Sequence, residues 1–518
     1  MHEDVRLLGE LIGRLAATRP DAEALSFQGR SRTWAEFDDR VRRVGGGLAA
    51  AGIAQGDRVA FVDKNHPACL ELTFGASALG AANAVVNWRL SGEELTYVLN
   101  DCGARVVFVG AELLPALNAI LPVLSSVERV IVVGGDADEY EDFLAAAAPA
   151  GIAESVSEHD GALIIYTSGT TGFPKGAVLT HRNLLAHARA VATAFPMTAT
   201  DRNLVAMPLF HVGGSCYAIV GFVLGQPTTM TREPDAASLL GALAEGVTHA
   251  FLVPAVVAGI AQAGERAMAA FAALSYLGYG ASPMPLPLLR TVLAAWPEVN
   301  FVQVYGMTEL SGAVSSLDPA AHRDGTRPER LASAGTVLPG VELRVVDPVS
   351  GEDAGQGEAG ELWFRTDQRM AGYLGKPEAT AETVVEGGWL RSGDVGRVDD
   401  GGFVFLEDRV KDMIITGGEN VYSPEVERVI AEFPSVGEVA VIGVPDERWG
   451  EQVKAIVAPA PGESVDIAKL VEYCRERLAH YKCPRSVDLV EALPRNATGK
   501  ILKRSLRQDY WRDQERKV

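Results

Sequence analysis

Apolar positions along the chain follow two alternating patterns. Short apolar runs of strand type, such as residues 105–109 and 161–165, are separated by longer segments in which apolar residues recur every three or four positions. Runs of the first kind are typical of buried strands, and the second pattern is typical of amphipathic helices. Ser91 precedes Glu94 by three residues, a capping-box spacing that predicts the start of one such helix. Strands that alternate with helices of this length predict an α/β fold with a parallel sheet covered on both faces.

The residue composition and the pattern of apolar positions change after residue 335. Glycine and aspartate become frequent, apolar runs shorten, and strict alternation predicts a small antiparallel β unit. The end of the chain has the pattern of a compact mixed α+β unit. We therefore expect a large N-terminal domain, residues 1–408, of stacked and mostly parallel α/β subdomains plus the small β unit. A hinge at residues 409–412 and a small mobile C-terminal domain, residues 413–518, would follow.

Chain length and net charge limit the number of domains and the kinds of partner that the protein can have. At about 150 residues per domain, 518 residues predict three to four structural units. A net charge of −20 argues against binding to nucleic acid or to an anionic membrane, because both need basic faces. Five widely spaced cysteines without a Cys-x-x-Cys pair favour a reducing, cytoplasmic location and no thiolate metal site. The acidic start of the chain argues against a signal peptide.

Residues 204–225 are nearly uncharged and long enough to cross a bilayer. Pro208, His211, Gly213 and Gly214 interrupt this stretch. We expect a strand, a loop and a buried helix here rather than a transmembrane segment.

Residues 166–176 read Tyr-Thr-Ser-Gly-Thr-Thr-Gly-Phe-Pro-Lys-Gly and lie between a strand-type run and a segment in which Thr180 or His181 can open a helix. Glycines let consecutive backbone N–H groups point inward, and hydroxyl side chains add donors that suit tetrahedral oxyanions. Lys175 adds a positive charge. The spacing does not fit the commoner loop with Gly-Lys-Ser/Thr at its end. A flexible linker is the alternative, but Pro-Lys-Gly between two ordered elements favours a phosphate-binding loop.

Two further segments follow strand-type runs. Tyr305 can stack on a base, Thr308 can hydrogen-bond a phosphate, and Glu309 can hold Mg²⁺, which takes carboxylate and phosphate oxygens together. The alternative is an ordinary strand–turn–helix with a capping Thr-Glu. Residues 278–283 are small enough to let the backbone approach a planar ring, although a tight turn explains them equally well.

In their order and spacing, from about residue 160 to 500, these motifs resemble the adenylate-forming superfamily of acyl-CoA synthetases, peptide-synthetase adenylation domains and beetle luciferases. They are most similar to bacterial fatty- or aryl-acid CoA ligases. The resemblance implies that the loop holds the pyrophosphate end of ATP and that Asp394 and Arg409 contact the ribose. It implies that Lys411 is the hinge and that Lys500 reaches the α-phosphate and the attacking carboxylate.

The ATP-binding residues are then Thr167, Ser168, Gly169, Thr170, Thr171, Gly172, Lys175, Gly280, Ala281, Ser282, Tyr305, Gly306, Asp394 and Arg409. The catalytic residues are Lys500, His211, Thr308 and Glu309, with Glu309 also the magnesium ligand.

The resemblance also implies an acyl pocket and a CoA site. An aromatic–His pair, Phe210 and His211, flanks the acyl site in the family, although a buried core histidine is the alternative. Glycines beside it leave volume for an apolar pocket. The expected lining is His211, Val212, Gly213, Gly214, Gly278, Tyr279, Gly280 and Met307. The expected CoA-binding residues are Gly417, Gly418, Glu419, Trp449, Tyr481 and Arg485, with core packing as the alternative for Trp449.

These expectations describe an AMP-forming, ATP-dependent carboxylate–CoA ligase. It would activate a monocarboxylic acid (medium-chain, alicyclic or aromatic) as acyl-AMP and pass it to the CoA thiol. The partners are then the acid, ATP, Mg²⁺ and CoA, with a homodimer as one option for the assembly. An amide ligase, in which an amine replaces the thiol, stays open, and a luciferase-like oxygenase is more distant. A nucleotide-binding regulator would lack one of Lys500, Glu309 or Asp394, and all three are present.

Overall fold

The computed structural model describes residues 4–136, 138–167, 174–348, 350–409, 412–416, 419–446, 449–495 and 501–512. At Arg409, Ile415, Glu419 and Asn420 the description covers the main chain only. The chain divides into two compact units. The first consists of Met1–Glu342 and Arg365–Leu390, and the second of Leu343–Phe364 and Arg391–Val518.

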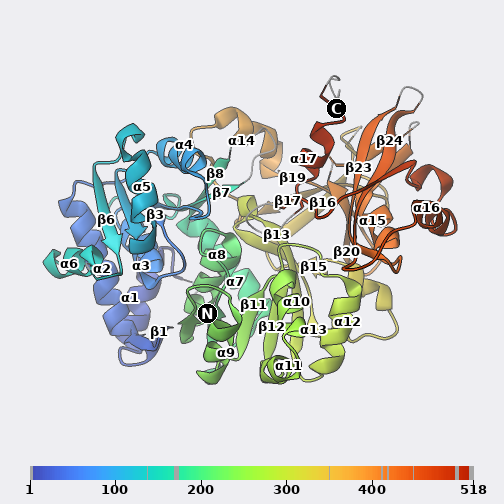
Figure 1. Cartoon of the computed structure of the whole chain (residues 1–518). Helices are drawn as coiled ribbons and strands as arrows, with labels where there is room; N and C mark the ends of the chain where they lie inside the picture. The colour runs from blue at the N-terminus through green and yellow to red at the C-terminus, as the bar shows by residue number, and fades with distance from the viewer. Residues whose placement is uncertain are drawn as a thin grey trace. The chain divides into compact units, whose positions relative to one another are not determined.

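Two large, mostly parallel sheets form the first unit (Figure 1). The seven-stranded sheet has the order β18 (Gly372–Tyr373), β8 (Lys175–Thr180), β7 (Gly161–Thr167), β4 (Ala82–Val85), β3 (Arg58–Val62), β5 (Val106–Gly110) and β6 (Arg129–Val133). The nine-stranded sheet has the order β15 (Thr336–Val337), β14 (Gly312–Leu317), β13 (Asn300–Met307), β12 (Tyr276–Gly280), β11 (His249–Leu252), β9 (Asn203–Val205), β10 (Thr228–Met230), β1 (Glu23–Phe27) and β2 (Arg30–Thr33). The predicted α/β class is confirmed.

Helices connect the strands of the first unit, as the alternating pattern predicts. They are α1 (Leu8–Thr18), α2 (Trp34–Ala50), α3 (Pro67–Ser77), α4 (Gly92–Cys102), α5 (Leu114–Ile120), α6 (Glu139–Ala146), α7 (His181–Ala194), α8 (Val212–Val223), α9 (Ala236–Ala244), α10 (Pro254–Gln262), α11 (Glu265–Phe271), α12 (Leu286–Ala295), α13 (Pro319–His322) and α14 (Pro377–Thr383). The capping box that predicts the start of α4 is confirmed, because Ser91 N–H donates to Glu94 Oε2 at 2.8 Å and Glu94 N–H donates to Ser91 Oγ at 3.4 Å.

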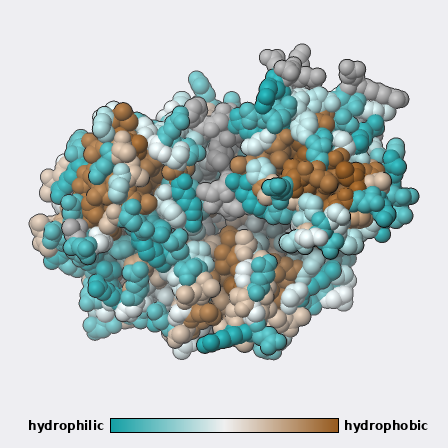
Figure 2. All heavy atoms as spheres, viewed as in Figure 1, coloured by the Kyte–Doolittle hydropathy of each residue, from teal (hydrophilic) through white to brown (hydrophobic). Residues whose placement is uncertain are grey.

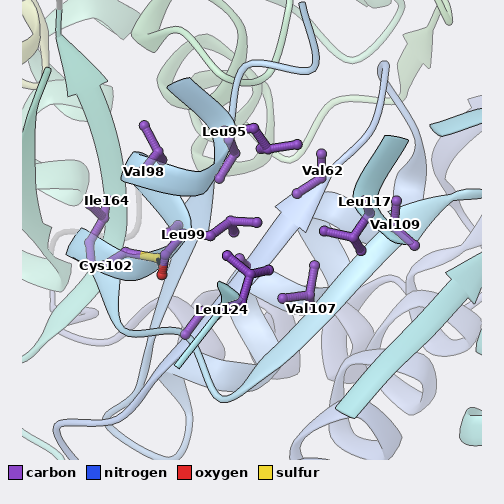
Figure 3. Packing of buried hydrophobic residues seen from close by; sticks show 14 of the residues in the cluster. Val62, Leu95, Val98, Leu99, Cys102, Val107, Val109, Leu117, Leu124 and Ile164 are labelled. Atoms are coloured by element: carbon purple, nitrogen blue, oxygen red, sulfur yellow. Dashed lines mark hydrogen bonds between the residues drawn. The ribbon is translucent and has the colours of Figure 1, made fainter. Parts of the chain in front are cut away.

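Apolar packing holds α4 against the seven-stranded sheet. Leu95 and Leu99 of α4 belong to one buried cluster with Val62 of β3, Val107 of β5 and Ile164 of β7 (Figure 3). The C-terminal end of α4 is thereby fixed beside β7, the strand that leads into the predicted phosphate-binding loop.

Some apolar side chains of the helices that cover the seven-stranded sheet are exposed at the protein surface. Figure 2 shows apolar side chains at the surface around α5, and Val123, which follows this helix, is 61% exposed.

No helix among the described residues is long and apolar enough to cross a membrane. The uncharged residues 204–225 contain β9, a loop and the buried helix α8, as predicted.

The second unit contains two smaller sheets. The four-stranded sheet has the order β16 (Val341–Val346), β17 (Gly360–Thr366), β19 (Leu390–Val398) and β20 (Val404–Arg409). The five-stranded sheet consists of β22 (Glu419–Val421), β21 (Ile414–Thr416), β24 (Gly450–Pro459), β23 (Val436–Asp446) and β25 (Ser486–Leu489). Its helices are α15 (Ser423–Ala431), α16 (Ile467–Arg475) and α17 (Lys503–Gln508). The predicted hinge residue Lys411 lies outside the described residues, and the domain boundary near residue 408 stays a prediction.

Candidate active site

The predicted phosphate-binding loop closes a β-hairpin. β7 and β8 pair in antiparallel fashion, with Thr167 opposite Lys175. The helix expected to follow the loop does begin at His181, and its N-cap Thr180 accepts a hydrogen bond from Asn183 N–H at 3.2 Å. The sequence did not indicate β8, which lies between the loop and this helix. Of the loop residues expected to bind ATP, Ser168, Gly169, Thr170, Thr171 and Gly172 lie outside the described residues.

Both ends of this loop are tied to α4. The Tyr166 hydroxyl donates to Asp101 Oδ2 at 2.8 Å, and Lys376 Nζ donates to Asp101 Oδ1 at the same distance. On the other end, the Tyr97 hydroxyl donates to the carbonyl of Pro174 at 3.2 Å. Burial raises the pKa of Tyr166, so its hydroxyl keeps its proton and acts as the donor. These anchors hold the two strands that present the loop.

Tyr373 of β18 connects the loop to the second signature motif. Its hydroxyl donates to Glu309 Oε1 at 2.6 Å, and its ring centroid lies 5.1 Å from Lys175 Nζ. The main chain is fixed as well, because Met370 N–H donates to the Glu309 carbonyl at 2.9 Å. Glu309 is only 6% exposed, and Thr308 beside it is half-buried. The structure therefore brings the predicted magnesium ligand and the loop lysine to one tyrosine, which sequence reasoning missed.

His187 of α7 supports the turn that follows Glu309. Its Nε2 accepts a hydrogen bond from Ala313 N–H at 3.1 Å, and burial lowers its pKa to about 3, so the ring is neutral. The turn contains Ser311 at φ 60° and Gly312 at φ 130°, both in the left-handed region. α7 follows the loop hairpin directly. It therefore links the loop to the position of Glu309.

The two segments expected to surround the adenine leave neighbouring parallel strands. Gly280 of β12 pairs with Val304 of β13, so Ala281 and Tyr305 emerge at the same edge of the sheet. Ala281 and Ser282 are exposed, and Tyr305 is half-buried. A Cβ on Gly280 would lie 2.4 Å from the Val304 carbonyl oxygen, so this position accepts only glycine.

Backbone strain marks the same two segments. Among the described residues, the non-glycine residues with positive φ are Gln28, Ala281 and Ser311. A left-handed residue with a side chain costs about 1–2 kcal/mol. Such conformations cluster at active sites and ligand clamps. Two of the three lie beside the predicted nucleotide-binding residues.

The predicted acyl site begins with His211, the N-cap of α8. Burial, assisted by the charge of Arg89, lowers the pKa of His211 to about 4, so its ring is neutral at pH 7. Its Nε2 is buried and has no hydrogen-bond partner among the described residues. The Arg89 guanidinium lies 4.3 Å from the Trp88 ring centroid and 5.7 Å from that of Phe210. Arg89 is a basic residue beside this site that the motifs did not reveal.

Aromatic rings fill the space that the glycines were expected to leave open. A Cβ on Gly278 would lie 2.3 Å from Phe195 Cζ, and one on Gly213 would lie 3.0 Å from Phe251 Cε1. Tyr217 of α8 packs against both phenylalanines, with ring centroids 6.0 and 5.7 Å away. The glycines thus serve close packing of α7, α8, β11 and β12, and the Phe and Tyr rings provide the apolar wall.

The other predicted pocket residues divide between this wall and the rest of the fold. Gly214 packs against the backbone, because a Cβ there would lie 2.2 Å from the Pro208 carbonyl oxygen. The Tyr279 ring lies on the opposite face of β12 from Gly278, and its hydroxyl hydrogen-bonds His322 Nε2 at 2.9 Å. That ring therefore does not line the same wall. Val212 and Met307 are half-buried.

The pair predicted to bind the ribose, Asp394 and Arg409, lies in the second unit. Asp394 of β19 and Arg409 of β20 are direct cross-strand partners in an antiparallel pair. The main chains of the two residues are therefore adjacent in the sheet. Asp394 is oriented locally, since its N–H donates to Ser392 Oγ at 3.0 Å. The structure thus brings together two residues that the resemblance assigns to one ribose.

The second unit also brings two predicted CoA-binding residues together. The Arg485 guanidinium lies 5.2 Å from the ring centroid of Trp449, and Arg485 is exposed. Tyr481 is 37% exposed. Gly417, Gly418 and the predicted catalytic Lys500 lie outside the described residues, and Glu419 is described in its main chain only.

The metal-ligating side chains present suit a Mg²⁺ ion that is already bound to the phosphates of a nucleotide. Among the described residues there is no group of three or more His, Cys, Asp or Glu side chains that could hold a metal by itself. Mg²⁺ is commonly bound by one or two carboxylates plus substrate phosphates. Glu309 offers one carboxylate whose Oε2 receives no hydrogen bond from the described residues. A single such carboxylate beside a glycine-rich hairpin suits this mode of binding.

Comparison with known proteins shows the family to which the chain belongs. The model of the AMP-binding enzyme family matches residues 13–374, and that of the AMP-binding enzyme C-terminal domain matches residues 425–500. The fatty acid–[acyl-carrier-protein] ligase ScoC of Streptomyces coeruleorubidus is 35% identical over 522 residues, covering 100% of this chain and 99% of the relative. The feruloyl-CoA synthase of an Amycolatopsis species is 39% identical over 505 residues, covering 97% and 99%.

A solved structure extends the likeness to the fold. The o-succinylbenzoate coenzyme A synthetase (MenE) from Bacillus subtilis, in complex with ATP and magnesium ion, matches with a TM-score of 0.82 and 27% identity over 96% of this chain and 98% of that one. The matches span both units. This chain belongs to the family of AMP-binding enzymes, which are adenylate-forming.

Proposed function

We propose that this chain is an ATP-dependent carboxylate–CoA ligase that releases AMP and pyrophosphate. The observation that carries the proposal is the arrangement at Tyr373, whose hydroxyl contacts Glu309 and whose ring contacts Lys175. A carboxylate and an ammonium held beside a glycine- and threonine-rich hairpin suit a triphosphate that arrives with Mg²⁺. Membership in the AMP-binding family supports the same chemistry.

The first step joins the acid to AMP. A carboxylate oxygen attacks the α-phosphorus of ATP, a P–O bond forms, and the bond to the β-phosphate breaks to release pyrophosphate. Lys175 and the hairpin hold the phosphates in place, and Lys500 would stabilise the charge that grows between the carboxylate and the α-phosphate. Bound Mg²⁺ neutralises negative charge on the departing pyrophosphate.

The second step passes the acyl group to a thiol. The CoA sulfur attacks the acyl carbon, the thiol proton leaves to water, and AMP departs with the bridging oxygen. Trp449 offers an aromatic face for the CoA adenine, and Arg485 offers a guanidinium for its phosphates. The relatives are named for joining acids to CoA or to an acyl carrier protein, which disfavours the amide-ligase alternative.

The acid is a monocarboxylic acid with a medium-chain, alicyclic or aromatic body. The wall formed by Phe195, Tyr217 and Phe251 supports this class, because aromatic rings pack well against apolar chains and rings. The feruloyl-CoA synthase and the fatty acid ligase among the relatives support both an aromatic and an aliphatic acid.

Pyrophosphate release with Mg·ATP tests the function directly. A panel of fatty, alicyclic and aromatic acids is assayed with CoA, with an acyl carrier protein, with amino acids, and with no acceptor. We expect release beyond one equivalent only with CoA. Turnover with the carrier protein alone would assign a different thiol, turnover with an amine would replace the ligase type, and absence of release with every acid would overturn adenylation itself.

Three further predictions accompany this proposal. A hinge at Lys411 separates residues 1–408 from residues 413–518. The enzyme is cytoplasmic, which the five buried free cysteines support. It assembles as a homodimer, which gel filtration with light scattering would test.

A further inference from the structure

Glu309 has an unequal environment at its two carboxylate oxygens. Oε1 accepts the Tyr373 hydroxyl at 2.6 Å, and Oε2 receives no hydrogen bond from the described residues. The residue is 6% exposed, so water reaches little of it. The hydrogen bond restrains one oxygen of the carboxylate, and the second oxygen remains for another partner.

Tyr373 is itself held from several directions. Its N–H donates to Thr380 Oγ1 at 2.9 Å, and β18 pairs with β8, where Tyr373 lies opposite Ala177. The next residue, Leu374, donates its N–H to the Gly176 carbonyl at 2.8 Å. The tyrosine therefore lies on the strand next to β8, one of the two strands that flank the loop, while its hydroxyl reaches Glu309, 64 residues away in sequence.

The hydroxyl of Tyr373 can act only as a donor to this carboxylate. An ionised carboxylate has no proton to give, so the phenol supplies the hydrogen of this bond. The ring face is used separately, because Lys175 Nζ lies 5.1 Å from its centroid. One side chain thus orients both charged residues of the proposed phosphate site.

We propose that Tyr373 is a positioning residue for magnesium-bound ATP: its hydroxyl fixes the Glu309 carboxylate and leaves Oε2 for the metal. This inference rests on the proposed function and deepens it. Partners that hold a metal-ligating carboxylate by hydrogen bonds orient it, and their removal commonly weakens metal binding 10- to 100-fold. Tyr373 acts through Glu309 and has no chemical step of its own.

The test measures binding without turnover. Titration calorimetry with the full chain and no acid compares ATP in the presence of Mg²⁺ with ATP in the presence of EDTA. We expect Tyr373→Phe to raise the Kd of Mg·ATP about 10-fold and to change the Kd of metal-free ATP less than twofold. Equal weakening with and without Mg²⁺, or unchanged affinity for Mg·ATP, would overturn the inference.

The chain offers a matched control. The Tyr140 hydroxyl donates to Glu71 Oε2 at 2.7 Å, and both residues are fully buried in the same unit. Tyr140→Phe removes the same chemical group from a Tyr–Glu pair that no predicted site residue touches. We expect both Kd values to match those of the wild type, and a selective loss of Mg·ATP affinity in this variant would also overturn the inference.

A double-mutant cycle shows whether Tyr373 acts through Glu309. In a Glu309→Gln background, Tyr373→Phe is expected to add less than a twofold change, because the carboxylate it orients is gone. Additive losses, or a Tyr373→Phe variant that does not fold, would assign Tyr373 a structural role instead. Wild-type protein that binds no Mg·ATP would overturn the proposed function, whereas normal wild-type binding with an unaffected Tyr373→Phe variant would overturn only this inference.

Discussion

The carbonyl oxygen of Gly312 lies 1.8 Å from the position that a Cβ on Gly306 would occupy. β13 and β14 meet at this point in an irregular register, just before Glu309. We expect Gly306→Ala to force the two backbones apart, to lower the free energy of unfolding by about 1–3 kcal/mol and to abolish pyrophosphate release. Urea unfolding and the release assay measure the two effects.

Gly259 provides the control for this substitution. It lies inside α10, and a Cβ there would meet nothing within 4 Å. Gly259→Ala is expected to stabilise the protein by about 0.5–1 kcal/mol, since alanine favours a helix interior. A Gly306→Ala variant as stable and active as Gly259→Ala would show that the close approach is relaxed in solution.

Local sequence patterns predicted the elements better than the partners of each side chain. The capping box at Ser91 and the helix start at His181 depend on residues within one turn, so the sequence reveals them. β8 was missed, because six residues after a glycine-rich loop carry no distinctive period.

The site could be predicted only where a motif is continuous. The segment 305–309 is one run of chain, and the sequence predicts Glu309 as a magnesium ligand from it. Tyr373 and Asp101 were not identified, because their partners lie 64 and 275 residues away in sequence. The expected space beside Gly278 likewise depends on Phe195, a residue of another helix that no local pattern connects to it.

Buried histidines predict how stability depends on pH. Burial lowers the pKa of His187 to about 3, and four other histidines, His66, His181, His211 and His322, have a pKa lowered to about 4, chiefly by burial. The unfolded chain binds these protons near pH 6.5, and the folded chain does not. The free energy of unfolding therefore falls as the pH decreases from about 6.5 towards 4, by up to about 1.4 kcal/mol per pH unit for each histidine.

Urea unfolding at pH 7.5, 6.5 and 5.5 measures this dependence. His187→Gln is expected to reduce the slope by about one proton below pH 6.5, and to lower stability at every pH by disturbing the bond to Ala313. His159→Gln is the control, because the side chain of His159 is 68% exposed. Equal slopes for the wild type and His187→Gln would show that His187 is protonated in the folded protein.

Two buried tyrosines are expected to respond oppositely to loss of the hydroxyl. The Tyr140 hydroxyl satisfies the buried Glu71, so Tyr140→Phe should cost about 1.5–3 kcal/mol. The Tyr217 hydroxyl is buried with no partner among the described residues, so Tyr217→Phe should be neutral or should stabilise by up to about 1 kcal/mol. Thermal unfolding of both variants measures the two stability changes. A destabilised Tyr217→Phe variant would reveal a hydrogen-bond partner for that hydroxyl.

The contact between Trp449 and Arg485 predicts a defect confined to the second half of the reaction. An aromatic face contributes about 1–3 kcal/mol to holding a base, so Trp449→Ala should raise the KM for CoA roughly 5- to 150-fold. Arg485→Ala should act in the same direction through lost phosphate contacts. Because neither residue is assigned to ATP or to the acid, the single equivalent of pyrophosphate released without CoA should keep its wild-type rate.

Arg477→Ala is the matched control, since the Arg477 guanidinium lies 3.6 Å from the Tyr473 ring centroid in the same unit but belongs to no predicted site. A slower first step in Trp449→Ala, or an unchanged KM for CoA in both variants, would place CoA elsewhere on the protein.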